Sequence, residues 1–368
     1  MVKHSDVIVV GGGAAGAAAT RALARAGASV TMLQPQEIPG EAWRAAAGML
    51  AAQVETTPDD PLFKLGIAGR AFYRREAPRL LEATGIDLGL SQSGILQLAL
   101  TAADEERYRA KVAWQRQRSE MAEWLTAEEV QEQWPWLAPG HGAFHAIDDG
   151  TLDPRRLVQA LRADAGLAGA VTIEDEVLAI LSAGGRVVGV RGAQGDHAAA
   201  RVVIAAGAWS GRLGGLPRPL SVEPVRGQVS AYRWPTDVPA ATVYGPRCYL
   251  LRRGEELWAG STMEHAGFTA ELSGRATDAI HERVTEIYPG LAGQTPIRSW
   301  AGLRPGTPDG RPIIGEEPRL PGLWYATGYG RNGILLSGIV GELIAQGIRG
   351  EPLPDEVAVF RPGRFWSW

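Results

Sequence analysis

The glycines of Gly11-Gly12-Gly13-Ala14-Ala15-Gly16 form the clearest chemical pattern near the start of the 368-residue chain. Gly11 permits a tight turn, Gly13 lets the backbone approach a pyrophosphate, and Gly16 lets a helix pack close to a strand. The free N–H groups and positive dipole end of a helix N-terminus attract phosphate. The spacing therefore predicts dinucleotide binding, and the alternative is an ordinary tight turn.

The elements around these glycines are the ones that such a site needs. Residues 6–10 are a β-branched apolar run, residues 14–26 have helical composition, and residues 28–33 are typical of a second buried strand. Gln34 ends that strand where an acidic residue usually holds the ribose hydroxyls. Its amide can still bond a ribose, although an exposed loop glutamine is the alternative.

A second small-residue turn follows another apolar run at residues 203–205. Ala206, Gly207 and Trp209 belong to this turn, which is typical of a strand that returns to close over the nucleotide. No second glycine fingerprint follows, and this favours FAD over NAD.

Composition excludes several classes of partner. The net charge of −4 and the pI near 6.0 provide no basic face for nucleic acid or anionic lipid, so we expect a small-molecule partner. The single cysteine, Cys248, excludes an intramolecular disulfide and is consistent with the cytoplasm. The six histidines are scattered without metal-ligand spacing, and the apolar run 333–348 is too short for a membrane span. We therefore expect no metal and no membrane insertion.

Five further sequence blocks stand out along the chain. They are Ala45-Ala46-Ala47-Gly48-Met49-Leu50, Cys248-Tyr249-Leu250, Gly260-Ser261-Thr262-Met263, the stretch 300–310 and the stretch 331–336. Through these blocks the sequence resembles, over nearly its whole length, the glycine oxidase branch of the D-amino acid oxidase superfamily.

The resemblance implies an FAD cofactor that is bound noncovalently, because no cysteine lies near Pro308-Asp309 to tether the flavin. It implies a substrate site built from Arg304, Tyr249, Met263 and Arg331. Together with the glycine turn, the expected cofactor contacts are Gly11, Gly13, Ala14, Ala15, Gly16, Gln34, Arg44, Ala46, Ala47, Gly48, Met49, Val177, Ala206, Gly207, Trp209, Tyr329, Gly330, Arg331, Asn332, Gly333, Ile334 and Leu335.

Arg304 suits the binding of an amino acid by its carboxylate, because the guanidinium fork takes both oxygens and would aim the α C–H at flavin N5. Tyr249 could donate its phenol to the same carboxylate. Met263 could be an adaptable apolar wall or plain core packing. An apolar site that favours the neutral amine needs no general base, and the helix that starts at Asn332-Gly333 could stabilise negative charge on the reduced flavin.

Two further arginines have open roles. Arg44 stands where relatives usually have small hydroxyl residues, and it could bond the pyrophosphate or point to solvent. Arg247, two residues before Tyr249, would lie on the same face of a shared strand. We hypothesise that Arg247 favours substrates with an extra negative group, and a solvent-facing side chain is the alternative.

The expected fold is α/β plus α+β. Residues 1–88, 145–220 and 300–368 would form a discontinuous, Rossmann-like FAD-binding domain of the glutathione-reductase-like kind. Residues 89–144 and 221–299 would form an inserted, mostly antiparallel substrate domain.

The leading functional hypothesis is an oxidase of glycine, sarcosine or small D-amino acids that produces hydrogen peroxide from O2. The first alternative is a flavin dehydrogenase that passes electrons to a quinone or carrier protein, and the second is a nucleotide-binding scaffold without turnover. The resemblance also implies a homo-oligomer, a dimer or tetramer, and a link to thiamine biosynthesis.

Overall fold

The computed structural model describes residues 5–58, 60–118, 120–235, 238–245 and 247–365. Its main parallel sheet runs in the order β17, β18, β11, β1, β2, β8, in which β17 alone is antiparallel to its neighbour, and β9 and β10 are joined to β11 as an antiparallel hairpin. The strands are β1 (Ser5–Val10), β2 (Val30–Gln34), β8 (Val171–Glu174), β9 (Val177–Ala183), β10 (Arg186–Gly192), β11 (Asp196–Ile204), β17 (Ile313–Glu316) and β18 (Leu323–Thr327).

A further sheet is antiparallel except where β13 pairs with β4. In sheet order its strands are β16 (Arg298–Gly306), β12 (Glu223–Arg233), β15 (Glu256–Gly260), β14 (Cys248–Arg253), β13 (Val243–Gly245), β4 (Ile95–Ala99), β6 (Gly142–Ala146) and β5 (Ala122–Thr126). The short strands β3 (Met49–Leu50) and β7 (Gly150–Thr151) pair with each other.

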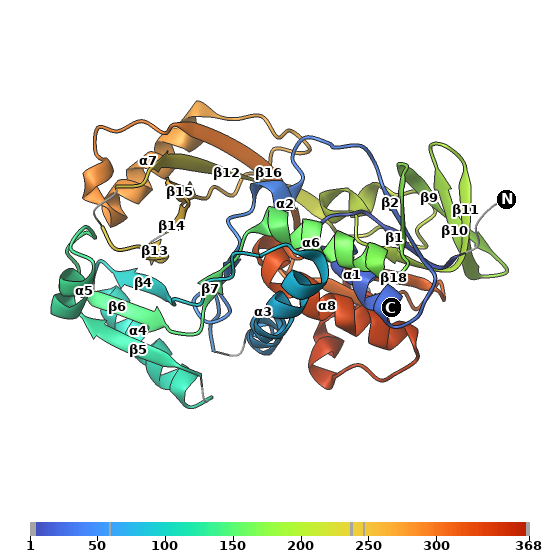
Figure 1. Ribbon diagram of the computed structural model, residues 1–368, viewed down its shortest axis with the longest axis horizontal. Coiled ribbons are helices and arrows are strands. Elements are labelled where there is room, and N and C mark those ends of the chain that lie inside the picture. Colours follow the sequence, from blue (N-terminus) through green and yellow to red (C-terminus); the bar gives the residue numbers. More distant parts are fainter. Residues whose placement is uncertain (1–4, 59, 119, 236–237, 246, 366–368) are drawn as a thin grey trace.

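Helices gather around both sheets (Figure 1). They are α1 (Ala14–Arg25), α2 (Ala42–Ala45), α3 (Leu62–Thr84), α4 (Ala102–Arg116), α5 (Ala127–Gln133), α6 (Pro154–Leu167), α7 (Gly274–Ile287) and α8 (Gly333–Ile348). Short 3-10 turns are η1 (Gly207–Arg212), η2 (Pro289–Leu291), η3 (Gly330–Asn332), η4 (Asp355–Phe360) and η5 (Pro362–Phe365). No helix within the described ranges is long and apolar enough to cross a bilayer.

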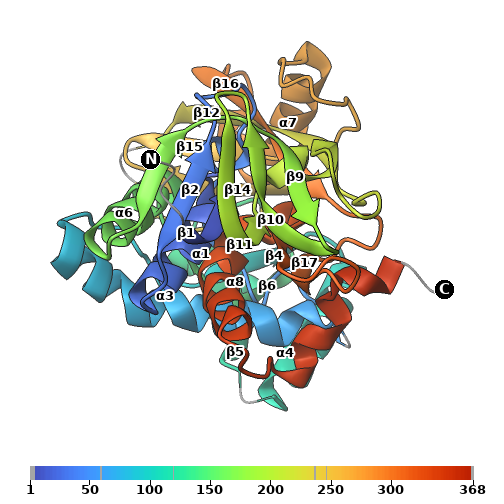
Figure 2. The ribbon, with the colours of Figure 1, turned by 90° about the vertical axis from the view of Figure 1, so that its right-hand side faces the viewer.

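Strand β1 is buried on both faces because each face has its own cover. Val7 and Val9 pack with α1, α3, α6 and α8, whereas Ile8 and Val10 pack with residues of β9, β10 and β11. Figures 1 and 2 show the strands β9, β10 and β11 at one end of the long axis of the molecule. Side chains that alternate along a strand explain why the sequence of β1 is a continuous apolar run.

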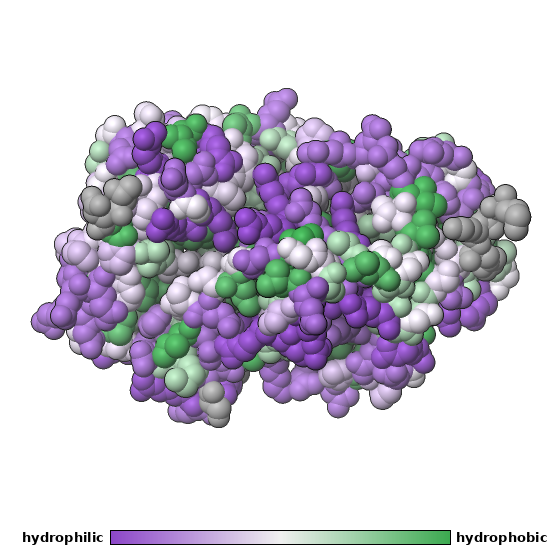
Figure 3. Space-filling model, in the orientation of Figure 1, coloured by the Kyte–Doolittle hydropathy of each residue, from purple (hydrophilic) through white to green (hydrophobic). Residues whose placement is uncertain are grey.

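Hydrophilic residues predominate on the face shown in Figure 3, and apolar residues form smaller patches between them. The large apolar side chains lie mainly in the interior, where Tyr73, Phe144 and Tyr325 are among the largest that are fully buried. This distribution is typical of a folded globular chain.

The predicted fold class is confirmed: a parallel sheet with helical cover is combined with a mostly antiparallel sheet. The predicted strand, glycine turn, helix and strand unit is β1, α1 and β2. The exact domain bounds stay a prediction. Strand β16 runs across the expected boundary at residue 300 and pairs with β12 of the expected substrate domain.

Buried ion pairs join three of the helices that pack on the main parallel sheet. Arg21 on α1 bonds Glu76 on α3 at 2.7 Å and Asp164 on α6 at 2.5 Å, and Arg25 also pairs with Asp164. Burial alone would raise the pKa of Asp164, but the hydrogen bonds from Arg25 and Arg21 outweigh burial and lower it. The Asp164 carboxylate is therefore ionised in the folded protein at neutral pH, and this ionisation favours folding.

We expect Asp164→Asn to lower the free energy of unfolding by about 3 kcal/mol, because it leaves a buried guanidinium short of its partner. Denaturant titration measures this change. Glu356→Gln is the control, since it breaks an exposed pair with Lys64 and should change the free energy of unfolding far less. The difference between the two variants should shrink as the pH falls below about 4, where Asp164 is protonated in the unfolded chain. Equal effects of the two substitutions at neutral pH would contradict the role of the cluster.

Candidate active site

The glycine turn at the start of α1 is shaped by close contacts that leave no room for side chains. Gly11 has a φ of +101°, and a Cβ there would lie 2.5 Å from the Ala205 carbonyl oxygen. A Cβ on Gly16 would lie 1.8 Å from the Gly11 oxygen. Gly13, the N-cap of α1, has no side chain to cap the helix, so the first N–H groups of α1 remain available to a ligand.

A cavity of about 1300 Å³ runs from this turn to the antiparallel sheet. Most residues expected to contact cofactor or substrate line it. They are Gly11, Gly13, Ala14, Ala15, Gln34, Ala46, Ala47, Gly48, Met49, Val177, Ala206, Gly207, Trp209, Tyr249, Met263, Arg304, Tyr329, Gly330, Arg331, Asn332, Gly333 and Ile334.

Three expected contacts do not line the cavity. Gly16 packs against the Gly11 backbone, which is the helix-to-strand role predicted for it. Leu335 is buried in the core with the helices. The guanidinium of Arg44 pairs with Glu41 at 2.6 Å and with Glu37 at 3.4 Å. Arg44 therefore pairs with carboxylates beside the cavity and is partly exposed, and its contact with a pyrophosphate stays a prediction.

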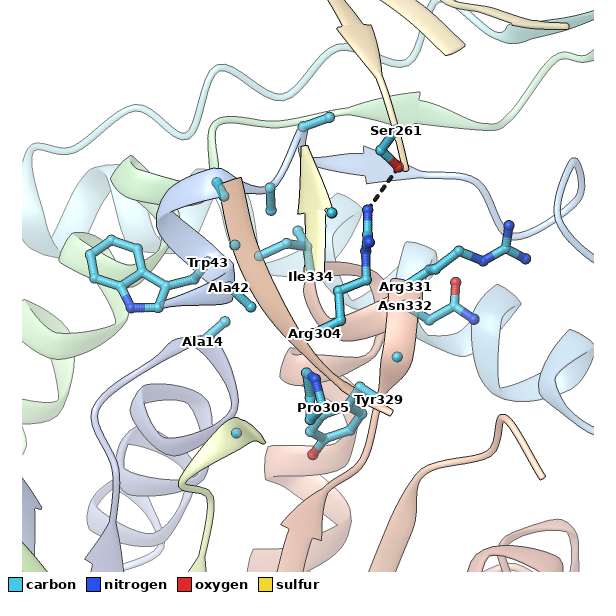
Figure 4. Close-up of a pocket in the computed structure, with 18 of the residues that line it drawn as sticks. Ala14, Ala42, Trp43, Ser261, Arg304, Pro305, Tyr329, Arg331, Asn332 and Ile334 are labelled. Carbon is cyan, nitrogen blue, oxygen red and sulfur yellow. Dashed lines mark hydrogen bonds between the residues drawn. The ribbon is translucent and has the colours of Figure 1, made fainter. Parts of the chain in front are cut away.

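Arg304 projects from β16 into the cavity (Figure 4). Its Nη2 donates to Ser261 Oγ at 2.7 Å and its Nη1 donates to the Thr262 carbonyl oxygen at 3.0 Å. Among the described residues no carboxylate forms an ion pair with it. Arg304 is half-buried, and this burial lowers the pKa of its guanidinium. A desolvated cation without a counter-ion is a binding site for an anion.

Gly227 on β12 makes the space that Arg304 occupies. A Cβ on Gly227 would lie 2.0 Å from Arg304 Nη1 and 2.3 Å from Cζ. Strand β16 is also tied to the glycine-turn side of the molecule, because Leu303 N donates to the Gly40 oxygen at 2.8 Å and Trp300 Nε1 donates to the Ala45 oxygen at 3.1 Å. These contacts fix the position of β16, and therefore the position of the Arg304 guanidinium in the cavity.

Tyr249 and Met263 lie beside Arg304. Burial raises the pKa of Tyr249, while the positive charge of Arg304 opposes that rise, so the phenol stays protonated and can donate. A Cβ on Gly260 would lie 2.8 Å from the Tyr249 hydroxyl, so this glycine makes room for the ring. Met263 is 59% exposed and its sulfur lies 3.8 Å from Arg304 Nη1, which excludes the core-packing alternative.

Arg331 differs from Arg304 because it faces a carboxylate. Its Nη2 lies 3.7 Å from Glu55 Oε2, and the negative charge of Glu55 raises the pKa of Arg331. Figure 4 shows Arg331 and Asn332 in front of the start of α8, close to Arg304. The α8 N-terminus therefore opens toward the cavity, although its effect on a reduced flavin stays a prediction.

Sequence reasoning missed Gly227, Glu55 and Tyr244. Glu55 follows the resemblance block 45–50 by five residues and lines the cavity, so its position after that block was an available signal. Tyr244 lines the cavity from β13 and its hydroxyl bonds Glu55. For Gly227 no signal existed, because only the register of β12 with β16 brings it under Arg304.

The strand argument for Arg247 is wrong. Arg247 precedes β14 and has a φ of +62°, so the alternation of side chains along a strand does not relate it to Tyr249. It does line the cavity. Its neighbour Cys248 is buried, and burial raises the pKa of that thiol to about 12.

The residues present fit an FAD. The cavity is elongated, its α1 end offers unbonded N–H groups, and Gln34 lies at the end of β2 where a ribose contact is expected. Arg162 adds positive charge there, since its Nε donates to the Gly12 oxygen at 2.9 Å. These groups would hold the pyrophosphate and adenosine, and the segment 329–334 would lie at the flavin end. The individual cofactor contacts stay predictions.

Comparison with known proteins agrees with this geometry. Residues 6–347 match the DAO family, described as FAD dependent oxidoreductase. A glycine oxidase of Geobacillus kaustophilus (strain HTA426) is 36% identical over 368 residues, covering 98% of this chain and 97% of that protein. A glycine oxidase of Pseudomonas aeruginosa is 33% identical over 367 residues, covering 97% and 99%. The crystal structure of glycine oxidase from Geobacillus kaustophilus superposes with a TM-score of 0.92 and 35% identity, covering 98% of this chain and 99% of that one.

The chain therefore belongs to the DAO family of FAD dependent oxidoreductases. Within that family its similarity is to glycine oxidases, which confirms the resemblance carried by the five sequence blocks. It is an FAD-dependent enzyme, and the contact of the glycine turn with that cofactor stays a prediction.

We expect Gly227→Ala to reduce amine turnover at least tenfold while the protein keeps its flavin, because the added methyl group displaces the guanidinium of Arg304 and not the nucleotide site. Steady-state kinetics and the flavin absorbance of the purified protein measure the two effects. Gly274→Ala is the control, since nothing lies within 4 Å of a Cβ at that position. Loss of flavin with retained turnover per bound flavin would contradict this account.

Arg247→Ala tests whether the guanidinium at the cavity wall selects acidic substrates. We expect kcat/KM for an amine with an extra carboxylate to fall several-fold relative to a neutral amine, because a cation near the site attracts the added charge. An unchanged ratio of the two values would remove the hypothesis.

Proposed function

We propose that this chain is a glycine oxidase, which oxidatively deaminates glycine and other small amines such as sarcosine and small D-amino acids. The imine product would hydrolyse to an oxoacid with release of ammonia or an amine, and O2 would be reduced to hydrogen peroxide. The observation that carries the proposal is the guanidinium of Arg304, which is desolvated in the cavity without a carboxylate partner among the described residues.

Bound FAD supplies the chemistry of this reaction by accepting a hydride from the carbon next to the amine and passing the electrons to oxygen. The chain supplies recognition and orientation. Arg304 would bind the substrate carboxylate through its fork, and Tyr249 would donate its phenol to the same group. Two contacts to one carboxylate limit its rotation, which holds the α-carbon in one place.

Support for the substrate comes from the relatives. The similar proteins of Geobacillus kaustophilus and Pseudomonas aeruginosa are glycine oxidases, and the likeness covers nearly all of this chain. The dehydrogenase and scaffold alternatives have no such support. Peroxide formation in air separates an oxidase from a dehydrogenase, and reduction of the flavin by glycine without oxygen excludes a scaffold.

The proposal extends to the setting of the enzyme. A single buried cysteine supports a reducing cytoplasm. The homo-oligomer and the link to thiamine biosynthesis rest on the resemblance. Light scattering of the purified protein would measure the number of subunits.

We expect Arg304→Ala to lower kcat/KM for glycine by about 100-fold, because two charged hydrogen bonds to the carboxylate are lost. Arg304→Lys should lose at least tenfold, since an ammonium does not reproduce the fork. The measurement is flavin reduction by glycine compared with reduction by ethylamine, which has no carboxylate. Ethylamine oxidation should be slow and should change little in either variant. If the variants lose glycine and ethylamine activity in the same proportion, Arg304 does not bind the carboxylate.

A further inference from the structure

Glu55 places a carboxylate inside the cavity that contains Arg304. Its side chain is only 10% exposed. Oε1 accepts the hydroxyl hydrogen of Tyr244, whereas Oε2 has no hydrogen-bond partner among the described residues although it is shielded from solvent. A buried carboxylate oxygen without a donor is costly, and such atoms are commonly completed by a ligand.

The backbone before Glu55 is held so that this side chain cannot easily leave the cavity. The carboxylate of Asp149 accepts hydrogen bonds from Gln53 N at 2.9 Å and Val54 N at 3.1 Å. Lys111 Nζ donates to the Val54 carbonyl oxygen at 2.5 Å and to Gln97 Oε1 at 3.2 Å. The fixed backbone makes Glu55 a preorganised acceptor, which needs little ordering when a ligand arrives.

The charged and titratable groups around Glu55 come from several elements. They are Tyr244 on β13, Tyr249 on β14, Arg304 on β16, Arg331 on η3 and Lys111 on α4. Lys111 and Arg304 donate their hydrogen bonds to other acceptors. Arg331 is the nearest cation at 3.7 Å, and its side chain is 54% exposed. Arg331 can therefore give way to a ligand cation at Oε2.

We propose that Glu55 recognises the protonated amino group of the substrate, so that the cavity binds an amino acid zwitterion between Glu55 and Arg304. This inference rests on the proposed function, because it completes the same substrate site. The ammonium N–H groups supply the donors that Oε2 lacks, while the substrate carboxylate supplies the anion that Arg304 lacks. Each end of the zwitterion thus meets a desolvated group of opposite charge.

When Glu55 binds the ammonium group of the substrate, it slows flavin reduction to an extent that depends on pH. A carboxylate next to an ammonium stabilises the charged form and raises the pKa of the bound amine. Oxidation requires the neutral amine, because its lone pair supports the developing iminium. The rate of flavin reduction therefore rises with pH through the pKa of the bound amine, and Glu55 moves that midpoint upward.

Glu55→Gln tests the proposal, since it keeps the size of the side chain and an acceptor for Tyr244 but removes the charge. Anaerobic flavin reduction by glycine over a range of pH gives the apparent Kd and the midpoint. We expect the Kd for glycine at neutral pH to rise at least tenfold and the midpoint to fall by about one pH unit. Glycolate, which has a carboxylate and no amine, should bind within about threefold of its wild-type Kd.

Glu223→Gln is the matched control, because it removes the same charge from an exposed side chain at the mouth of the adjoining cavity. It should leave the Kd and midpoint for glycine unchanged. An unchanged Kd in Glu55→Gln, an equal loss of glycine and glycolate binding, or a midpoint that stays or rises would each overturn the proposal.

If Glu55→Gln does not retain flavin, Tyr244→Phe decides the question. Loss of the phenol concentrates the negative charge on the carboxylate, so the midpoint for glycine should rise, and a fall would overturn the proposal. A wild-type flavin that no amine reduces would contradict the proposed function itself. Reduction of the wild type by glycine, with a Glu55→Gln variant that behaves like the wild type, would contradict only the role of Glu55.

Discussion

The substrate end of the cavity depends on the half-buried guanidinium of Arg304, for which the described residues offer no carboxylate within ion-pair distance. Arg304 is held by a hydroxyl and a carbonyl oxygen, which orient it but do not neutralise it. Such an arrangement is unfavourable in the absence of an anion, and the surrounding strands must hold it in place. The space left by Gly227 and the anchoring of β16 at Gly40 and Ala45 provide that support.

The same strand links recognition to cofactor binding. β16 is an edge of the antiparallel sheet, and its Leu303 bridges directly to Glu41 in the segment between β2 and α2. Residues of this segment also line the cavity close to the glycine turn. A shift of β16 would therefore move Arg304 relative to the cofactor end, so the geometry of the reaction depends on packing between distant parts of the chain.

Sequence alone could predict the elements whose signals are local. The apolar run of β1, the glycine turn and the composition of α1 all lie within about 20 neighbouring residues, and the structure has them as expected. Arg304 and Tyr249 could be named only through the resemblance. Gly227 could not be named at all, because its role depends on the register of two strands that are far apart in sequence, which pairs Gly227 with Gly302 and so brings it under the side chain of Arg304. Arg247 shows the opposite failure, since a left-handed residue before β14 interrupts the alternation on which the prediction relied.

The burial of Cys248 has a consequence for the proposed reaction, which would release peroxide beside the side chains of the cavity. Thiols are oxidised as thiolates, and a thiol with a pKa of about 12 is almost entirely protonated in a neutral cell. The sole sulfhydryl of the chain thus lines the reaction chamber in its unreactive form. The hydrophobic surroundings that pack this sheet thus also protect this thiol from the oxidant that the proposed reaction would generate at every turnover.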